Sequence, residues 1–447
     1  MKRILINTQS PPIRFINYKG PSSAQVDLNF FSPDIDYVIS TGGVVRMVLP
    51  FLESLINQNY FDEAYWVSLN INAPEKVSMG KIFLNHVMIP EQVLKNYGLI
   101  KEELWKFFHK LEKKEKIIEN IWREEFADFI YYNRIVAERI FELDKKLDFD
   151  IFYIHDFQQL NIGYMLSSLK PKLFRWHIPF LEEILPQEWR TNLSIYLNSY
   201  DGIIVSTKNY LENLKTLGYN GKSFVSYPYI DPKIYKKPEE DIIKEFCSKY
   251  DIKYEEKVIL CIARLDYAKN QPILVKALKE ISKSVDAKVI FVGNGSFSSS
   301  KQGLGLSKAD LVRSMIMELA NELDLKEKVV ITGYLDQKML NAAYTRADLF
   351  VLPSILEGFG LVVVEAWLFK KPVIVSKNAG ISELIREGEN GYTINPYDYN
   401  EIAEKAIELL TNEEKAKRLG EEGYKTARLC TIEEGLKKEI DIISLFL

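Results

Sequence analysis

The sequence has few of the residues and segments that mark an exported or membrane-embedded protein. It contains only three cysteines and four histidines in 447 residues. Cys247, Cys261 and Cys430 are scattered without metal or redox spacing, so we interpret them as reduced structural thiols. No apolar run reaches the roughly 20 residues that span a bilayer. The opening MKRILINTQSPP is too short in apolar residues for a secretory signal, so we expect a cytoplasmic protein.

The chain also lacks an excess of charge of either sign. Its 58 Lys and Arg against 62 Asp and Glu give a net charge of -4, which offers no basic field for nucleic acid. Hydrophobic residues make up 47% and charged residues 27%, as in globular proteins. A chain of 447 residues is too long to fold around one ordinary hydrophobic core. We therefore expect two domains and small-molecule partners, with the oligomeric state left open.

Short β-branched runs alternate with helical periods along most of the chain. Examples are residues 36–43, 149–156 and 257–266. This alternation predicts parallel sheets with crossover helices, and hence an α/β protein with two Rossmann-like domains. Three prolines and a charge run at 227–246 mark the boundary between the domains, and residues 101–146 read as a helical insertion in the first. Residues just after the strands are then the ones to examine for chemistry.

The most informative motif is PSILEGFGLVVVEAWLFKKPVIVS, at residues 353–376. Backbone N–H groups at a helix start would face an anion there, and the helix dipole favours negative charge. Glu357 would bind hydroxyls on one side of a diphosphate and Glu365 those on the other. The alternative is an ordinary helix with one glutamate near its start and one in solvent. The backbone positions involved are Gly358, Phe359, Gly360 and Leu361.

Cations and glycines follow other strands. Arg264 and Lys269 in LCIARLDYAKNQP would neutralise a diphosphate leaving group, unless both are simply solvated. Gly293 marks either an ordinary turn or a close approach of backbone to a nucleotide. Gly42 and Gly43 in ISTGGVV would let a substrate approach the backbone, or form a tight turn.

Histidines and an aspartate follow two strands of the first half. His155 and Asp156 lie in YIHDFQQL, and His177 lies in KLFRWHIPF. Such groups at strand ends could orient sugar hydroxyls or act as acid and base, although each alone is more often structural.

Together these stretches resemble the retaining nucleotide-sugar glycosyltransferases with two facing Rossmann-like domains and the active site in the cleft between them. ARLDYAKN, VGNG, EGFGLVVVEA and NGYTINP look like the sucrose-synthase type, whereas RILINTQSPP, STGGVV, LWKFFH, YYNRIVAERI, IHDFQQL and WHIPF resemble trehalose-6-phosphate synthases. The resemblance implies an acceptor domain at 1–230, a nucleotide-sugar domain at 231–424, and a C-terminal helix of about 425–447 that packs back on the first. It also implies transfer of glucose from UDP-, ADP- or GDP-glucose to glucose 6-phosphate, with no other cofactor and no metal.

The resemblance assigns roles to the candidate residues. Arg264 and Lys269 would hold the nucleotide diphosphate, Glu365 the ribose, and Glu357 with backbone 358–361 the donor sugar. His177 would lie near the anomeric carbon and 6-hydroxyl of the donor glucose. Asp156 and Trp105 would face the acceptor. Gly42 and Gly43 would cover the donor phosphates, and Gly293 would also lie on the donor side.

Two departures from the trehalose-6-phosphate synthases leave alternatives open. Those enzymes carry an arginine after the first strand that grips the acceptor phosphate, whereas this chain has NTQ at 7–9. Arg14, Arg46 or Lys301 would have to replace it. Glu357 stands where those synthases have aspartate, so the donor also stays open. The alternatives are a trehalose synthase or related transferase acting on free glucose or another small sugar or polyol, a sugar phosphorylase, and a regulator that binds sugar nucleotides.

Overall fold

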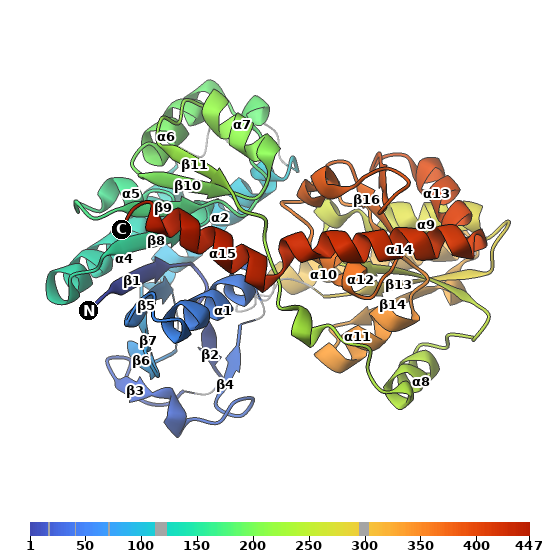
Figure 1. Ribbon diagram of the computed structural model, residues 1–447, viewed down its shortest axis with the longest axis horizontal. Helices are drawn as coiled ribbons and strands as arrows, with labels where there is room; N and C mark the ends of the chain where they lie inside the picture. Colours follow the sequence, from blue (N-terminus) through green and yellow to red (C-terminus); the bar gives the residue numbers. More distant parts are fainter. Residues whose placement is uncertain (17, 41, 70–71, 112–122, 295–303) are drawn as a thin grey trace. The chain divides into compact units, whose positions relative to one another are not determined.

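The structure is a computed structural model that describes residues 1–447 except 17, 41, 70–71, 112–122 and 295–303 (Figure 1). The chain divides into two compact units. Unit 1 contains Met1–Pro228 and Ile432–Leu447, and unit 2 contains Tyr229–Thr431. The family resemblance implies domain boundaries after residues 230 and 424, and the sequence pattern alone marks one at 227–246.

Unit 1 is built on a mostly parallel sheet, nine strands wide over the described residues. Its order is β11-β10-β9-β8-β1-β5-β7-β6-β3, and β6 runs antiparallel to β7. The strands are β1 (Arg3–Asn7), β3 (Gln25–Asp27), β5 (Glu63–Leu69), β6 (Lys76–Met79), β7 (Ile82–Val87), β8 (Ile151–His155), β9 (Lys172–Arg175), β10 (Gly202–Val205) and β11 (Lys222–Val225). Strands β5 and β7 extend the sheet on one side of β1 and β8 to β11 on the other, so the order reverses between β1 and β8.

A separate antiparallel ribbon in unit 1 corrects one prediction. Strand β4 (Tyr37–Ile39) pairs with β2 (Ile13–Phe15) instead of joining the parallel sheet. The sequence pattern predicts that residues 36–43 lead from a parallel strand into a helix. The helix is present, but the prediction of a parallel strand is wrong. The physical reason is burial: Val38 and Ile39 are exposed, whereas a parallel strand is covered on both faces.

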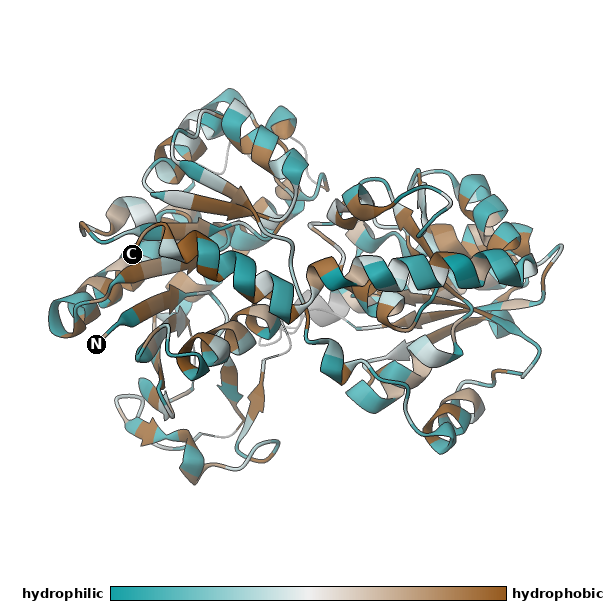
Figure 2. Ribbon diagram, viewed as in Figure 1, coloured by the Kyte–Doolittle hydropathy of each residue, from teal (hydrophilic) through white to brown (hydrophobic). Residues whose placement is uncertain are grey.

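Helices cover both faces of the unit 1 sheet, and its central strands β1, β5 and β8 are largely brown in Figure 2 because they are apolar on both faces. One core cluster joins the sheet to α2, α4, α6 and α7. The region expected to be a helical insertion contains the end of α2 and most of α4, and residues 112–122 between them lie outside the described part. The helices of unit 1 are α1 (Gly43–Asn57), α2 (Glu91–Phe108), α4 (Glu124–Leu147), α5 (Ile162–Met165), α6 (Gln187–Leu197), α7 (Lys208–Thr216) and α15 (Ile432–Ser444), with short 3-10 turns η1 (Leu28–Phe30), η2 (Phe157–Gln159) and η3 (Glu182–Ile184).

The C-terminal helix α15 belongs to unit 1, where Figure 1 shows it in red in front of β8 and β9. Its Glu439 forms a fully buried ion pair with Arg175 at the end of β9. The hydroxyl of Tyr153 on β8 donates to the same carboxylate at 3.1 Å. A buried charge is tolerated when it is paired and hydrogen-bonded, so this cluster fixes α15 on the sheet.

Unit 2 contains a parallel sheet of six described strands in the order β14-β13-β12-β15-β16-β17. The strands are β12 (Lys257–Ile262), β13 (Ala287–Val292), β14 (Val329–Gly333), β15 (Leu349–Leu352), β16 (Val373–Ser376) and β17 (Tyr392–Ile394). In chain order this is 3-2-1-4-5-6, the doubly wound Rossmann arrangement, which reverses between β12 and β15.

The helices of unit 2 pack on both faces of this sheet around a second core cluster. They are α8 (Glu240–Lys249), α9 (Gln271–Ile281), α10 (Leu304–Glu322), α11 (Gln337–Arg346), α12 (Leu361–Leu368), α13 (Tyr399–Thr411) and α14 (Glu413–Ala427), with short turns η4 (Pro232–Ile234), η5 (Tyr267–Lys269), η7 (Lys326–Lys328), η8 (Gly380–Leu384) and η9 (Arg428–Cys430). Cys247, Cys261 and Cys430 are free thiols, as predicted, and burial raises the pKa of Cys261 to about 12. Within the described ranges, every helix is too short or too polar to cross a membrane.

Candidate functional site

The carboxyl ends of β12 and β15 in unit 2 bring the strongest candidate residues together. These two strands are neighbours in the sheet, and the strand order reverses between them. Ligands of open parallel sheets bind outside the strand ends at such a reversal. Lys269 follows β12 and Glu357 follows β15, so the fold places both at the expected position.

Lys269 lies at the end of η5, a short turn that is well anchored. The Asp266 side chain accepts a hydrogen bond from Ala268 N at 3.0 Å, and the Asn270 amide donates to Pro353 O and Pro396 O. Lys269 itself is buried, and its Nζ forms an ion pair with Glu357 Oε2. The structure therefore pairs the predicted diphosphate cation with the predicted sugar-binding carboxylate, each of which offers charge to a ligand.

The turn from Glu357 to Gly360 is held by backbone contacts with the loop after β16. Glu357 N donates to Asn378 O at 3.2 Å, and Gly380 N donates to Glu357 O at 3.1 Å. Gly360 has φ +109°, and a side chain there would also approach Leu352 to 3.0 Å. Only glycine adopts this backbone readily. The turn leads directly into α12, whose first N–H groups have no partner within the helix.

Arg264 and Gly293 lie on neighbouring loops of unit 2. Arg264 is exposed, and its carbonyl oxygen accepts a 2.7 Å hydrogen bond from Gln271 Nε2. Gly293 has φ +139°, and a Cβ there would lie 2.1 Å from Ala263 O. The close approach of the Arg264 loop therefore requires a glycine at this position. The sequence alone could not distinguish this structural need from nucleotide binding.

Glu365 on α12 is buried and hydrogen-bonded on both oxygens. Tyr235 Oη donates to Oε1 at 2.8 Å, and Tyr344 Oη donates to Oε2 at 2.6 Å. Sequence reasoning missed both tyrosines, because neither lies near Glu365 in the chain and no motif links them. The ribose contact of Glu365 stays a prediction.

In unit 1 the corresponding reversal lies between β1 and β8. Asn7 and Thr8 at the end of β1 are buried and engaged in the fold: Asn7 Nδ2 donates to Val67 O at 2.9 Å, and Thr8 Oγ1 accepts from Trp66 Nε1 at 2.8 Å. The resemblance leads one to expect an acceptor-binding arginine just after β1. This chain has uncharged side chains there. Asp156 follows β8 on the other side of the reversal.

Asp156 has a strained and enclosed position. Its φ is +71°, which is uncommon for a residue other than glycine, and its Oδ1 accepts a hydrogen bond from His177 N at 3.3 Å. Burial raises the pKa of Asp156 to about 6, although hydrogen bonds from Phe157 N, His177 N and Gln158 oppose the shift. A carboxyl with such a pKa in a strand-end site is a candidate for sugar binding or proton transfer.

His155 and His177 are brought together by β8 and β9. His155 Nδ1 lies 3.0 Å from His177 Nε2, and the two rings are nearly parallel. His155 is buried, whereas His177 is partly exposed. Burial and the nearby Arg175 cation lower the pKa of both imidazoles well below the usual value, and each histidine is therefore neutral at pH 7.

The remaining predicted residues of unit 1 lie on several elements. Gly42 and Gly43 are exposed at the start of α1, and a Cβ at either would meet open space. Gly42 has φ -64°, so packing and backbone conformation do not demand a glycine there. This favours the prediction that these positions leave room for a ligand. Arg46 is exposed on α1, and Trp105 on α2 stacks on His109 with ring centroids 4.0 Å apart.

Arg14 and Lys301 complete the predicted set. Arg14 lies on β2 and is partly buried, which lowers its pKa. Its guanidinium makes no hydrogen bond or ion pair with the described residues. Lys301 lies outside the described residues. Over the described part of the chain, His, Cys, Asp and Glu form no group of three or more suited to hold a metal ion.

Comparison with known proteins finds relatives of this chain. Residues 243–426 match the family model described as Glycosyl transferases group 1. The chain is similar to trehalose synthase of Thermococcus litoralis, with 25% identity over 303 residues that cover 67% of this chain and 70% of that protein. It is also similar to N-acetyl-alpha-D-glucosaminyl L-malate synthase of Bacillus anthracis, with 30% identity over 195 residues, 44% of this chain and 46% of that protein.

A solved structure shows the same fold over the whole chain. It is described as trehalose-6-phosphate from E. coli bound with UDP-2-fluoro glucose, and it matches with a TM-score of 0.76, 19% identity and full coverage of both chains. The fold is therefore the GT-B fold of glycosyltransferases, with two Rossmann-like domains, as predicted. Residues 243–426, which match the model of the group 1 glycosyl transferases, lie within unit 2.

Proposed function

We propose that the protein transfers glucose from a nucleotide-glucose donor, such as UDP-glucose, to glucose 6-phosphate, because residues 243–426 of unit 2 match the model of the group 1 glycosyl transferases. The product would be trehalose 6-phosphate, formed with retention at the anomeric carbon. The observation that carries the proposal is the Lys269–Glu357 pair at the strand reversal of unit 2, directly before the N-terminus of α12.

The donor half of the proposal follows from the chemistry of these groups. A diphosphate is stabilised by the helix N-terminus and by a nearby ammonium group. Lys269 is buried and Arg264 is exposed on the adjacent loop, so one provides an enclosed ammonium group and the other a guanidinium at the surface. Glu357, released from Lys269 by the diphosphate, would accept hydrogen bonds from sugar hydroxyls.

The proposed reaction needs no protein nucleophile. The acceptor hydroxyl oxygen forms a bond to the anomeric carbon on the face from which the diphosphate oxygen departs. The bond from the anomeric carbon to that oxygen breaks, and the acceptor proton passes to a leaving phosphate oxygen. The protein contributes positioning and charge stabilisation. In this scheme Asp156 and Trp105 bind the acceptor, and Gly42 and Gly43 leave room for the donor phosphates, whereas the donor contact of Gly293 would come from its backbone.

The acceptor half depends on a cation for the phosphate. A dianion in an enclosed site needs a charged partner. Arg14 is suited to that role, because its guanidinium is partly buried and makes no contact of this kind with the described residues. Arg46 and Lys301 stay further candidates. Arg14→Ala should raise the KM for glucose 6-phosphate severalfold and leave that for the nucleotide sugar nearly unchanged.

A second function, transfer to free glucose, is favoured by one observation. The end of β1 presents the buried, uncharged Asn7 and Thr8 and no arginine. The similarity to a protein named trehalose synthase points the same way.

A donor and acceptor screen tests both functions. UDP-, ADP- and GDP-glucose are combined with glucose 6-phosphate or glucose, with and without EDTA, and the anomeric configuration of the product is determined. We expect an α,α-linked product with glucose 6-phosphate and activity that survives chelation. Equal or better use of free glucose, with no effect of Arg14→Ala, would favour the second function. Product formed from phosphate and trehalose without nucleotide would identify a phosphorylase.

A further inference from the structure

The His155–His177 pair in unit 1 allows an inference about which nitrogen carries each proton. Two neutral imidazoles that share a hydrogen bond have two possible arrangements. In the first, His155 Nδ1–H donates to His177 Nε2. In the second, His177 Nε2–H donates to His155 Nδ1. The 3.0 Å distance between these nitrogens is compatible with both. The groups around the pair decide between them.

The second nitrogen of His155 separates the two arrangements. His155 Nε2 is buried and has no hydrogen-bond partner within the described part of the chain. In the first arrangement it is an unprotonated nitrogen, and in the second it is a buried N–H with no acceptor. Buried N–H groups without an acceptor are rarer in proteins than buried acceptors with a lone pair unused. Burial therefore favours the first arrangement.

The charge next to His155 favours the same arrangement. Arg175 is the register partner of His155 on the neighbouring strand, so both side chains lie on the same face of the sheet. A guanidinium carries only donors, and it repels another N–H while it attracts an unprotonated nitrogen. The other ionisable groups near the pair are Tyr153 on β8, Asp156 after β8, and Glu439 on α15, which is itself paired with Arg175.

We infer that His155 is a positioning residue that donates from Nδ1 to His177 Nε2 and so fixes the proton of His177 on Nδ1. His177 is partly exposed, and its Nδ1 hydrogen bonds to none of the described residues. It then offers an N–H to a ligand oxygen and has no free lone pair with which to accept a proton. If the proposed function holds, this N–H donates to a hydroxyl or ring oxygen of a sugar, and His177 does not act as a general base.

The small number of histidines makes the inference directly measurable. Nitrogen NMR of protein labelled with 15N-histidine, without any substrate, reports the tautomer of each of the four rings. His86 Nδ1 and His109 Nδ1 face the carbonyl oxygens of Pro74 and Trp105, at 2.6 and 2.8 Å. A carbonyl only accepts, so these two rings are internal references for the Nδ1–H form. We expect His155 and His177 to show the same form, and an Nε2–H tautomer of His177 would overturn the inference.

Substitution separates the effect of His155 from that of the surroundings. His155→Phe removes the donor and frees His177 Nε2 to carry a proton, so both tautomers of His177 should appear. His86→Gln serves as the assignment control and should leave His177 unchanged. A pure Nδ1–H form of His177 in His155→Phe would contradict the role of His155, and if that variant does not fold, the spectrum of the unaltered protein still decides. All these spectra are recorded without substrate, so a failed glycosyl transfer assay would count against the proposed function alone.

Discussion

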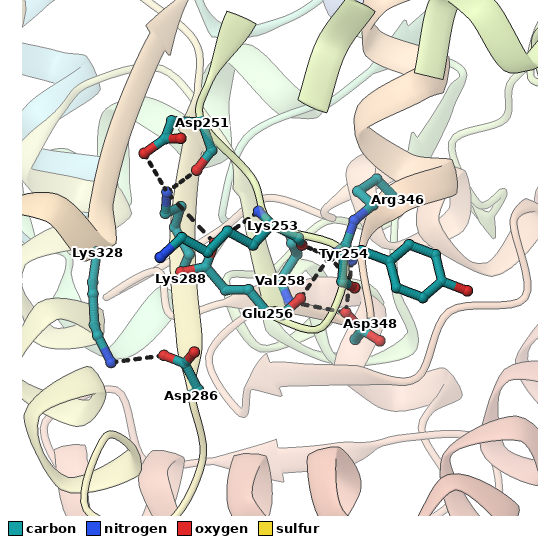
Figure 3. Close-up of polar contacts among 10 residues, drawn as sticks. All are labelled: Asp251, Lys253, Tyr254, Glu256, Val258, Asp286, Lys288, Lys328, Arg346 and Asp348. Carbon is teal, nitrogen blue, oxygen red and sulfur yellow. Dashed lines mark hydrogen bonds and ion pairs between the residues drawn. The ribbon is translucent and has the colours of Figure 1, made fainter. Parts of the chain in front are cut away.

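At the amino ends of the unit 2 strands charged side chains bind one another and the backbone, whereas at the carboxyl ends they surround the start of a helix. Figure 3 shows the amino-end cluster, in which Arg346 contacts Asp348 at 3.1 Å and Glu256 O at 2.6 Å. Asp348 in turn accepts from Val258 N at 2.9 Å. These contacts join the segment before β12 to the start of β15, so they stabilise the sheet.

The charged groups described at the carboxyl ends have a different arrangement. Lys269 pairs with Glu357 beside the first turn of α12, and Arg264 is exposed on the adjacent loop. These groups can exchange their present partners for a ligand. The comparison teaches that substitutions at the amino ends should reduce stability and preserve activity. Substitutions at the carboxyl ends should reduce activity and preserve stability.

The largest expected effect is at the amino ends, for Lys288→Met. Lys288 is buried, and its Nζ lies 3.5 Å from Glu256 Oε2, which is also buried. Removing one partner of a buried ion pair leaves the other charge uncompensated and costs about 3–5 kcal/mol. Urea unfolding should show this loss, while turnover per folded molecule stays unchanged. The double variant Lys288→Met/Glu256→Leu should recover part of the stability. If Lys288→Met lost turnover and kept its full stability, the proposed difference between amino and carboxyl ends would be wrong.

The next effect extends the comparison to the carboxyl end of β8 in unit 1. The pKa of Asp156 is raised from 3.8 to about 6 by burial, so the folded protein binds its proton more tightly than the unfolded chain. The resulting stability is fully present below pH 3.8 and is lost as the pH rises through about 6. At about 1.4 kcal/mol for each pKa unit, the loss is about 3 kcal/mol. Asp156→Asn should flatten the dependence of the free energy of unfolding on pH in this range. An unchanged dependence would show that the pKa of Asp156 is not raised.

The third effect concerns activity at the carboxyl ends of unit 2. Lys269→Ala and Arg264→Ala should each lower turnover at least about tenfold, because a charge contact at the leaving group is lost. Far-UV circular dichroism should show an intact fold. Steady-state kinetics with the best donor of the screen provide the measurement. Normal turnover in both variants would remove the diphosphate assignment.

The smallest effect serves as the control for the amino ends. Lys328 and Asp286 form an ion pair at 3.0 Å, but Asp286 is 70% exposed. Exposed pairs contribute little because water and salt screen them, so Lys328→Ala should change the free energy of unfolding by less than about 1 kcal/mol. A change as large as that of Lys288→Met would show that the whole cluster acts as one network.

Local patterns in the sequence predicted much of the fold and part of the candidate site. The alternation of strands and helices predicted two doubly wound domains, and strand-end positions pointed to Lys269 and Glu357, which the fold brings into contact. These predictions succeed because strand ends and turn glycines are local features. The functional roles of the site residues stay predictions.

Contacts between distant parts of the chain could not be predicted. Tyr235 and Tyr344 reach Glu365 only through the packing of η4, α11 and α12, and no periodicity reports such packing. The need for Gly293 arises from the carbonyl of Ala263 on another loop. Strand β4 also left the parallel sheet, because its three residues are too exposed for a strand covered on both faces.

The buried pair of Arg175 and Glu439 has a consequence for biosynthesis. The two residues are 264 positions apart, and the whole of unit 2 is encoded between them. A ribosome that has made β9 must still add unit 2 and then α15 before Arg175 receives its carboxylate. Domains generally fold as units during synthesis. We therefore expect unit 2 to complete its fold before unit 1, and a ribosome stalled before residue 432 to carry a nascent chain whose first-made domain is unfinished.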